Sequence, residues 1–261
     1  MMTLVYFLIA FFASTIGALS GIGGGVIIKP VMDSLGAMSV ASVSFLSGCT
    51  VLVMSGVSVL RSRRGGMAIE KGVTVFLALG ACAGGFAGKA AFQALETAFD
   101  RSDQVGIVQA ALLLAVNIGV FVYLRMKEKL AALRVRNRAV CTLIGLGLGM
   151  LSAFLGIGGG PINIAVLAFF FSMTPKQTAV NSLFIILCSQ STSLFGALIS
   201  GTVPAFPWAV LPVMAAGGVA GALVGGRLLN KLDDEKVHRL FSAVLVLLIA
   251  LNVYNIVRFS L

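Results

Sequence analysis

Long uncharged, apolar stretches alternate along the chain with short segments that hold almost all of the charged residues. The uncharged stretches are 1–28, 34–60, 72–88, 105–124, 139–175, 177–226 and 240–257. A transmembrane helix needs about 20 consecutive apolar residues. The pattern therefore predicts an all-α polytopic membrane protein with about eight membrane segments.

The stretch 177–226 is too long for one crossing. As a single helix it would measure about 75 Å, more than twice the hydrocarbon thickness of a bilayer. Gly201, Pro204 and Pro207 provide a turn near its middle. We therefore expect two helices in this stretch.

The stretch 139–175 is interrupted by glycine rather than by charge. Residues 139–155 nearly span the membrane, and the loop GIGGG at 156–160 follows them. Pro161 and about a dozen apolar residues come next, enough for only about 18 Å of helix. We expect a broken or re-entrant helix with GIGGG at its tip, and the same arrangement over residues 3–36.

The chain also contains an internal repeat. Three signals recur in the same order: GIGGG at 21–25 and 156–160 (offset 135), Ala-x-x-Ser at 41–44 and 179–182 (offset 138), and glycines at 80, 84 and 88 and at 217, 221 and 225 (offset 137). We interpret them as two transmembrane repeats, 1–124 and 139–261, joined by a basic cytoplasmic linker over 125–138. Internal repeats are common in secondary transporters.

The basic loops occupy opposite positions in the two repeats. The loop 61–71 carries four Lys or Arg residues and its partner 199–206 carries none, whereas 96–104 carries one and its partner 227–239 carries four. Because basic loops stay on the cytoplasmic side, we expect inverted repeats with both termini outside. Parallel repeats with four full crossings each are the alternative, and they would place 227–239 outside.

Composition excludes several other classes of protein. Hydrophobic residues make up 59% of the chain and charged residues 11%, whereas soluble domains contain about 25% charged residues. The mean hydropathy of +1.05 excludes a soluble globule, a disordered chain and a disulfide-built secreted module. The net charge of +10 is concentrated between apolar runs, so we expect contact with membrane lipids and no nucleic-acid partner.

Patterns for catalysis or metal binding are not apparent. The four cysteines lie in or beside apolar runs without C-x-x-C spacing, and we interpret them as small hydrophobic residues. The single histidine, His238, lies in a charged loop. We therefore predict no enzyme activity, no metal and no cofactor. The N-terminus has no basic segment before its first apolar run, so we expect that run to be retained.

The two GIGGG loops are the leading candidates for a binding site. A helix break at membrane depth is tolerated only where it is buried in protein or lines a watery cavity. Pro161 suits the first turn of a new helix, whose positive N-terminus would attract anions. The alternative is that glycine only permits close helix packing, the role we assign to the other glycine stripes. The candidates are Gly23, Gly24 and Gly25 in the first loop and Gly158, Gly159 and Gly160 in the second.

Polar residues near these loops extend the candidate site. Lys29 follows the first loop and would supply positive charge, while Asp33 either pairs with it or carries a proton. The alternative is that both reach the membrane interface, as we expect for Lys89. Polar residues of 177–200 either line a path or hydrogen-bond helices together. The polar candidates are Lys29, Ser44, Asn163, Asn181, Ser182 and Gln190.

The paired GIGGG loops, the basic linker and the Ala-x-x-Ser stretches together resemble the TauE/SafE family of sulfite exporters, over nearly the whole chain. The resemblance implies export of a small sulfur-containing anion such as sulfite or an organosulfonate. It assigns a role to the glycines of both loops and to Asn181 and Ser182. Val43 stands where the first repeat would match Asn181, so the repeats are not equivalent there.

These observations predict a secondary transporter of the cell (inner) membrane that exports a small anion by alternating access. Moving one negative charge out of an inside-negative cell releases about 2.3 kcal/mol per 100 mV, so we expect electrogenic export. Transport of another small anion or solute and a role in membrane assembly are the alternatives. The sequence leaves the exact substrate, the coupling ion and the oligomeric state open.

Overall fold

The computed structural model describes residues 2–64, 70–99, 102–126 and 133–260. Over these residues the chain is all-helical and contains no strand. Its helices are α1 (Met2–Ser20), α2 (Gly25–Leu35), α3 (Val40–Arg64), α4 (Lys71–Ala98), α5 (Ser102–Met126), α6 (Arg138–Leu155), α7 (Gly160–Phe171), α8 (Pro175–Ile199), α9 (Val210–Lys231) and α10 (Asp234–Ser260). Residues 127–132 of the predicted linker, 65–69 of the first basic loop and 100–101 of the loop 96–104 lie outside the described residues. The all-α prediction is confirmed.

Eight of the described helices are long and apolar enough to cross a membrane, which confirms the predicted number of segments. The other two, α2 and α7, contain 11 and 12 residues. At 1.5 Å per residue they are too short to cross. Each follows a GIGGG loop, so the interruptions predicted from glycine are present as breaks between helices.

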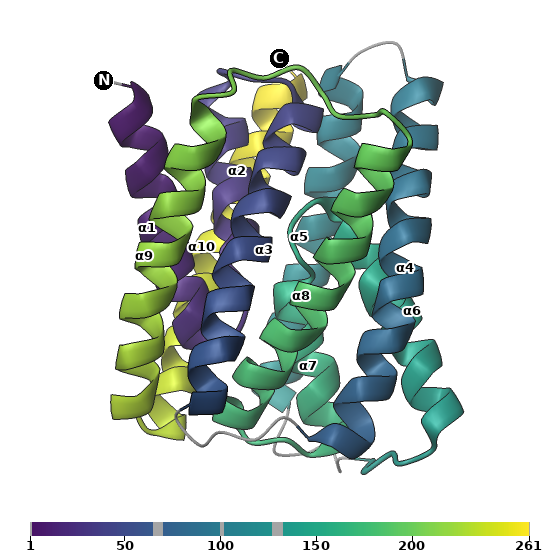
Figure 1. Cartoon of the computed structure of the whole chain (residues 1–261), viewed down its shortest axis with the longest axis vertical. Coiled ribbons are helices and arrows are strands. Elements are labelled where there is room, and N and C mark those ends of the chain that lie inside the picture. The colour runs from purple at the N-terminus through teal and green to yellow at the C-terminus, as the bar shows by residue number, and fades with distance from the viewer. Residues whose placement is uncertain (1, 65–69, 100–101, 127–132, 261) are drawn as a thin grey trace.

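Both ends of the chain lie at the same end of the bundle (Figure 1), which we call the terminus face. The helix α8 ends there, and α9 begins there after the connection 200–209. At the opposite end, the basic face, α3 and α9 end and α6 begins. The short helix α2 lies in the half of the bundle nearer the terminus face and α7 in the half nearer the basic face (Figure 1).

The two glycine stripes join each repeat to the other one. On α4, the backbone at Gly84 contacts Leu146 of α6, and on α9 the backbone at Gly221 contacts Phe11 of α1. An added Cβ at either glycine would overlap a main-chain carbonyl oxygen of the neighbouring helix. The predicted packing role of these glycines is confirmed. The pairs α4–α6 and α1–α9 form opposite edges of the bundle (Figure 1).

Local signals explain where the helices of the second repeat begin. Asn137 caps α6 by accepting from the backbone N–H of Ala139 at 2.9 Å. Thr174 and Gln177 form a reciprocal capping box before α8, with Pro175 in the first turn. Such caps satisfy amide groups that have no partner within the helix.

Candidate functional site

The two GIGGG loops contact each other inside the bundle. An added Cβ on Gly25 would lie 2.6 Å from the carbonyl oxygen of Ile157, and one on Gly160 would overlap the carbonyl oxygen of Ile22. All residues of both loops are buried. Each loop therefore approaches the backbone of the other more closely than any residue with a side chain would allow. We call this contact the crossing.

Glycine is also needed at the crossing for backbone conformation. Gly23 has φ +76° and Gly158 has φ +80°, a left-handed region that residues with a side chain rarely adopt. A Cβ on Gly23 would lie 3.1 Å from Ile186 Cδ1, and one on Gly158 would lie 3.0 Å from Val51 Cγ1. Val51 of α3 and Ile186 of α8 thus bracket the crossing with two fully buried apolar side chains.

Two helix N-termini lie at the crossing. The helix α2 begins at Gly25 and α7 begins at Gly160, so each directs the positive end of its dipole there. The N–H of Gly24 donates to Met54 Sδ at 3.3 Å, a weak acceptor. Asn163 is 1% exposed and its Oδ1 has no hydrogen-bond partner, close to where a Cβ on Gly159 would lie. The two helix N-termini favour a small anion, whereas the free oxygen of Asn163 can only accept a hydrogen bond.

A small cavity of about 20 Å³ lies beside the second glycine loop. It lies toward the terminus face, because Ser44 is near the start of α3 and Ala197 is near the end of α8. Ala153 of α6 and Gly156, which follows that helix, also form part of its wall. The other lining residues are Phe45, Lys89, Phe92, Gln190, Ser193 and Leu194. We call it the Lys89 cavity.

The Lys89 cavity combines one cation with neutral donors. Lys89 is partly buried, and its Nζ lies 5.0 Å from the centroid of the Phe92 ring. Ser44 Oγ is buried without a hydrogen-bond partner. Gln190 is 2% exposed, and its Nε2 donates to Ser152 Oγ at 3.4 Å. An ammonium group with hydroxyl and amide donors in a confined apolar setting would bind an anion.

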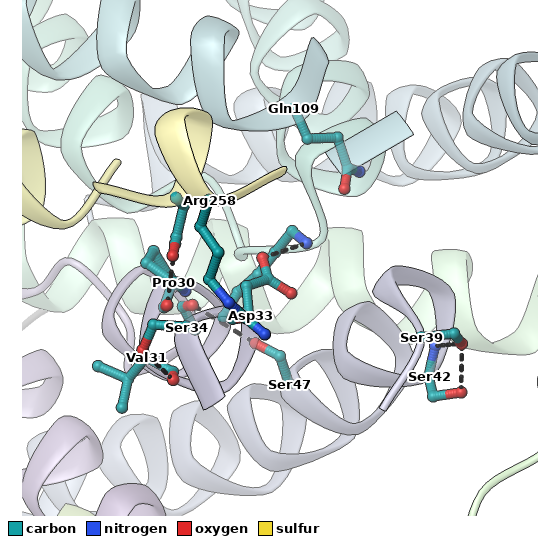
Figure 2. A network of polar contacts seen from close by, with 12 residues as sticks. Pro30, Val31, Asp33, Ser34, Ser39, Ser42, Ser47, Gln109 and Arg258 are labelled. Carbon is teal, nitrogen blue, oxygen red and sulfur yellow. Dashed lines mark hydrogen bonds and ion pairs between the residues drawn. The ribbon is translucent and has the colours of Figure 1, made fainter. Parts of the chain in front are cut away.

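Lys29 lies in a separate polar network at the terminus end of α2. It is 1% exposed, and its Nζ lies 2.9 Å from Asp33 Oδ2, as the sequence suggested. Figure 2 shows Arg258 of α10 reaching Asp33, where it donates to the main-chain carbonyl. Asn255 Nδ2 donates to the carbonyl oxygen of Pro30 at 2.9 Å. The network joins α2 of the first repeat to α10 of the second, and it already neutralises the charge of Lys29.

Asn181 and Ser182 lie apart from the Lys89 cavity. Asn181 Oδ1 accepts from the N–H of Glu70 at 3.1 Å and from Thr74 Oγ1 at 2.6 Å, so it joins α8 to the start of α4. Ser182 Oγ is buried without a hydrogen-bond partner. Neither residue lines the cavity, whereas the predicted residues Ser44 and Gln190 both do.

The site predicted from the sequence did not include Lys89, Phe92 or Arg258. Lys89 is one of only two charged residues between 72 and 98, and that isolation in a membrane segment was an available signal. Phe92 and Arg258 carried no comparable signal. Their neighbours in space lie on helices distant in the sequence, so only the packed structure reveals them.

The family model for the sulfite exporter TauE/SafE matches residues 6–253, which include both glycine loops and the Lys89 cavity. The chain belongs to the TauE/SafE family. It is therefore a member of a family of membrane transporters, and its eight apolar helices make it a multi-pass membrane protein.

A relative from Bacillus subtilis (strain 168), named probable membrane transporter protein YunE, is 28% identical over 105 residues. This match covers 40% of the present chain and 37% of the relative. No solved structure matches the chain.

Proposed function

We propose that this TauE/SafE protein exports a small sulfur-containing anion, sulfite or an organosulfonate, across the cell (inner) membrane, and that it does so as a transporter without catalysis. The observation that carries the proposal is the Lys89 cavity, where a partly buried cation faces uncharged donors beside a glycine loop. Glu96 lies near enough to act on the charge of Lys89, but the described residues that line the cavity include no carboxylate. A partly buried ammonium group in such a wall favours an anionic ligand over a cation or a neutral solute.

The proposal includes two inverted repeats, 1–124 and 139–261. Contacts at the crossing are reciprocal, since Gly21 packs on Ala179 and Gly156 packs on Ser44. Adding 135 to Gly21 and Ser44 gives Gly156 and Ala179, so each contact is the other with the repeats exchanged. For α3 and α8 these contacts favour an offset of 135, three residues less than the offset of the Ala-x-x-Ser match. These reciprocal contacts support a twofold relation between the repeats. The opposite placement of α2 and α7 favours inverted over parallel repeats (Figure 1).

Alternating access would use the same relation. The Lys89 cavity lies on the terminus side of the crossing, and Val51 and Ile186 pack against the crossing itself. An anion leaving the cell would pass these two side chains to reach the cavity. Exchanging the packing of the two repeats would close this side and open the other, as in transporters built from inverted repeats.

The test replaces Lys89 by glutamine in full-length protein reconstituted into liposomes. Because Lys89 is the only charged residue among the described residues that line the cavity, we expect Lys89→Gln to lower kcat/KM for sulfite by more than about tenfold. Sulfite flux is measured anaerobically under an imposed potential, and net negative charge should move with it. Lys231→Gln is the control, because Lys231 is an exposed lysine at the basic face.

Two results would contradict the proposal. One is wild-type protein that moves neither sulfite nor an organosulfonate at any potential. The other is an equal loss of flux in Lys89→Gln and Lys231→Gln, which would reduce the effect to surface charge.

A further inference from the structure

We infer that Arg61 and Ser58 of α3 form a second oxyanion subsite, on the basic side of the crossing, as the spatial counterpart of the Lys89 cavity. The inference rests on the proposed function and adds a residue pair that receives the anion before it passes the crossing. Both residues lie in the last two turns of α3, close to the basic face.

Corresponding positions on α3 and α8 follow one another in opposite directions from the crossing. On α3, Ser44, Val51 and Ser58 are seven residues apart, so they fall near one face of the helix about 10 Å from one another. Ala179, Ile186 and Ser193 have the same spacing on α8. Val51 and Ile186 contact the crossing, while Ser44 and Ser193 line the Lys89 cavity. Ser58 is thus the counterpart of Ser193 on the basic side.

The positive charge on the basic side comes from a different helix. Lys89 follows Gly88 on α4, but the counterpart Gly225 on α9 is followed by Gly226. A Cβ on Gly226 would lie 3.0 Å from Arg61 Cδ and 3.6 Å from Arg61 Nε. Arg61 therefore places its side chain where the counterpart of Lys89 would begin. The missing lysine is replaced in space by an arginine of the other repeat.

Both groups have unused hydrogen-bonding capacity. Arg61 Nε and Ser58 Oγ are buried atoms without a hydrogen-bond partner, and Ser58 is 4% exposed. Two residues three positions apart lie on the same face of a helix, so these donors are placed to act together. A buried donor without a partner is costly, and a guanidinium group binds oxyanions strongly. Sulfite would satisfy both donors, and so would the phosphate of a lipid headgroup.

The experiment measures the half-saturating sulfite concentration separately from each face. Inverted membrane vesicles present the basic face and right-side-out vesicles present the terminus face. Arg61→Gln is expected to raise KM about tenfold at the basic face and to leave KM at the terminus face unchanged. Lys89→Gln is expected to give the opposite pattern. Arg227→Gln is the matched control, because Arg227 is an exposed arginine next to Gly226.

Each other outcome overturns the inference. An equal rise in KM from both faces, or the same rise in Arg227→Gln, would show that Arg61 acts only through the general surface potential. No rise would show that Arg61 does not bind the anion. An effect confined to liposomes containing anionic lipid, and absent in phosphatidylcholine, would assign the oxyanion to a headgroup.

The proposed function is tested separately by wild-type flux. If no flux occurs, sulfite-induced thermal stabilisation of wild-type protein and Arg61→Gln in detergent still tests the subsite. A shift that is smaller in Arg61→Gln but not in Arg227→Gln supports it, whereas equal shifts or none overturn it. Arg61→Lys keeps the positive charge, so it should restore part of the sulfite-induced thermal shift that Arg61→Gln loses.

Discussion

The short helices α2 and α7 occupy corresponding places in the two repeats but treat polar residues differently. In α2, Lys29 and Asp33 are paired with each other and held by α10. Their counterparts in α7, at an offset of 135, are Ile164 and Ala168. Conversely, Asn163 of α7 has an unpartnered Oδ1, and its counterpart in α2 is Ile28.

The difference separates anchoring from binding. Charges paired inside the protein, as Lys29 and Asp33 are in α2, fix a helix in place, because removing one partner leaves a buried charge. An uncharged amide with a free oxygen, as in Asn163 of α7, can still accept a hydrogen bond from a ligand or from water. We therefore assign the network of α2 to stability and the free oxygen of Asn163 to a hydrogen bond from a protonated anion or from its water. The substitutions below test the crossing and this division.

The largest effect is expected where the two loops are most alike. Gly160→Val would place a side chain on the carbonyl oxygen of Ile22 and push α7 away from the crossing, so we expect sulfite flux to be abolished in liposomes. Gly147→Val on α6 is the matched control, since no atom lies within 4 Å of the position of its Cβ. Full flux in Gly160→Val would show that the close contact of the loops is unimportant.

An intermediate effect is expected in α2. Asp33→Asn leaves Lys29 buried without its counter-ion, which should cost about 3–5 kcal/mol of stability, measured by thermal unfolding in detergent. The double variant Lys29→Ile with Asp33→Ala gives α2 the residues of α7 and should recover most of that loss. If the double variant is as stable as wild type but transports nothing, the pair has a role in transport, and anchoring alone is contradicted.

The smallest effect is expected in α7. Asn163→Ile gives α7 the residue of α2 at this position and removes a buried amide with an unpartnered oxygen, so stability should be unchanged or slightly higher. Sulfite flux should fall several-fold, because the site loses an acceptor near Gly159 for the proton or the water that accompanies the anion. Unchanged flux, measured beside the melting temperature, would remove Asn163 from the site.

Much of the fold could be predicted because its signals are local. Four glycines in five residues cannot continue a helix in lipid, and the offset of 135 between Gly21 and Gly156 makes the duplication visible. The broken helices at Gly25 and Gly160 follow directly from these signals. The inverted orientation, inferred from loop charge, stays a prediction.

The candidate site was less predictable because its members meet only through packing. Asn181 looked like part of a polar path, yet its side chain holds the start of α4, since Glu70 and Thr74 lie against it. Lys89 looked like a residue reaching for the interface, yet it lines a cavity with Gln190 of α8. Arg61 is one of several basic residues in sequence, and only its position against Gly226 distinguishes it.

The glycine stripes have a consequence for biosynthesis. The first helix packs through its backbone on α9, more than 200 residues later in the chain, and α4 packs likewise on α6. Neither repeat contains the partner for its own glycine-contacting surface. During membrane insertion α1 must wait in lipid until nearly the whole polypeptide has left the ribosome, so the earliest helix made is among the last to reach its final neighbour.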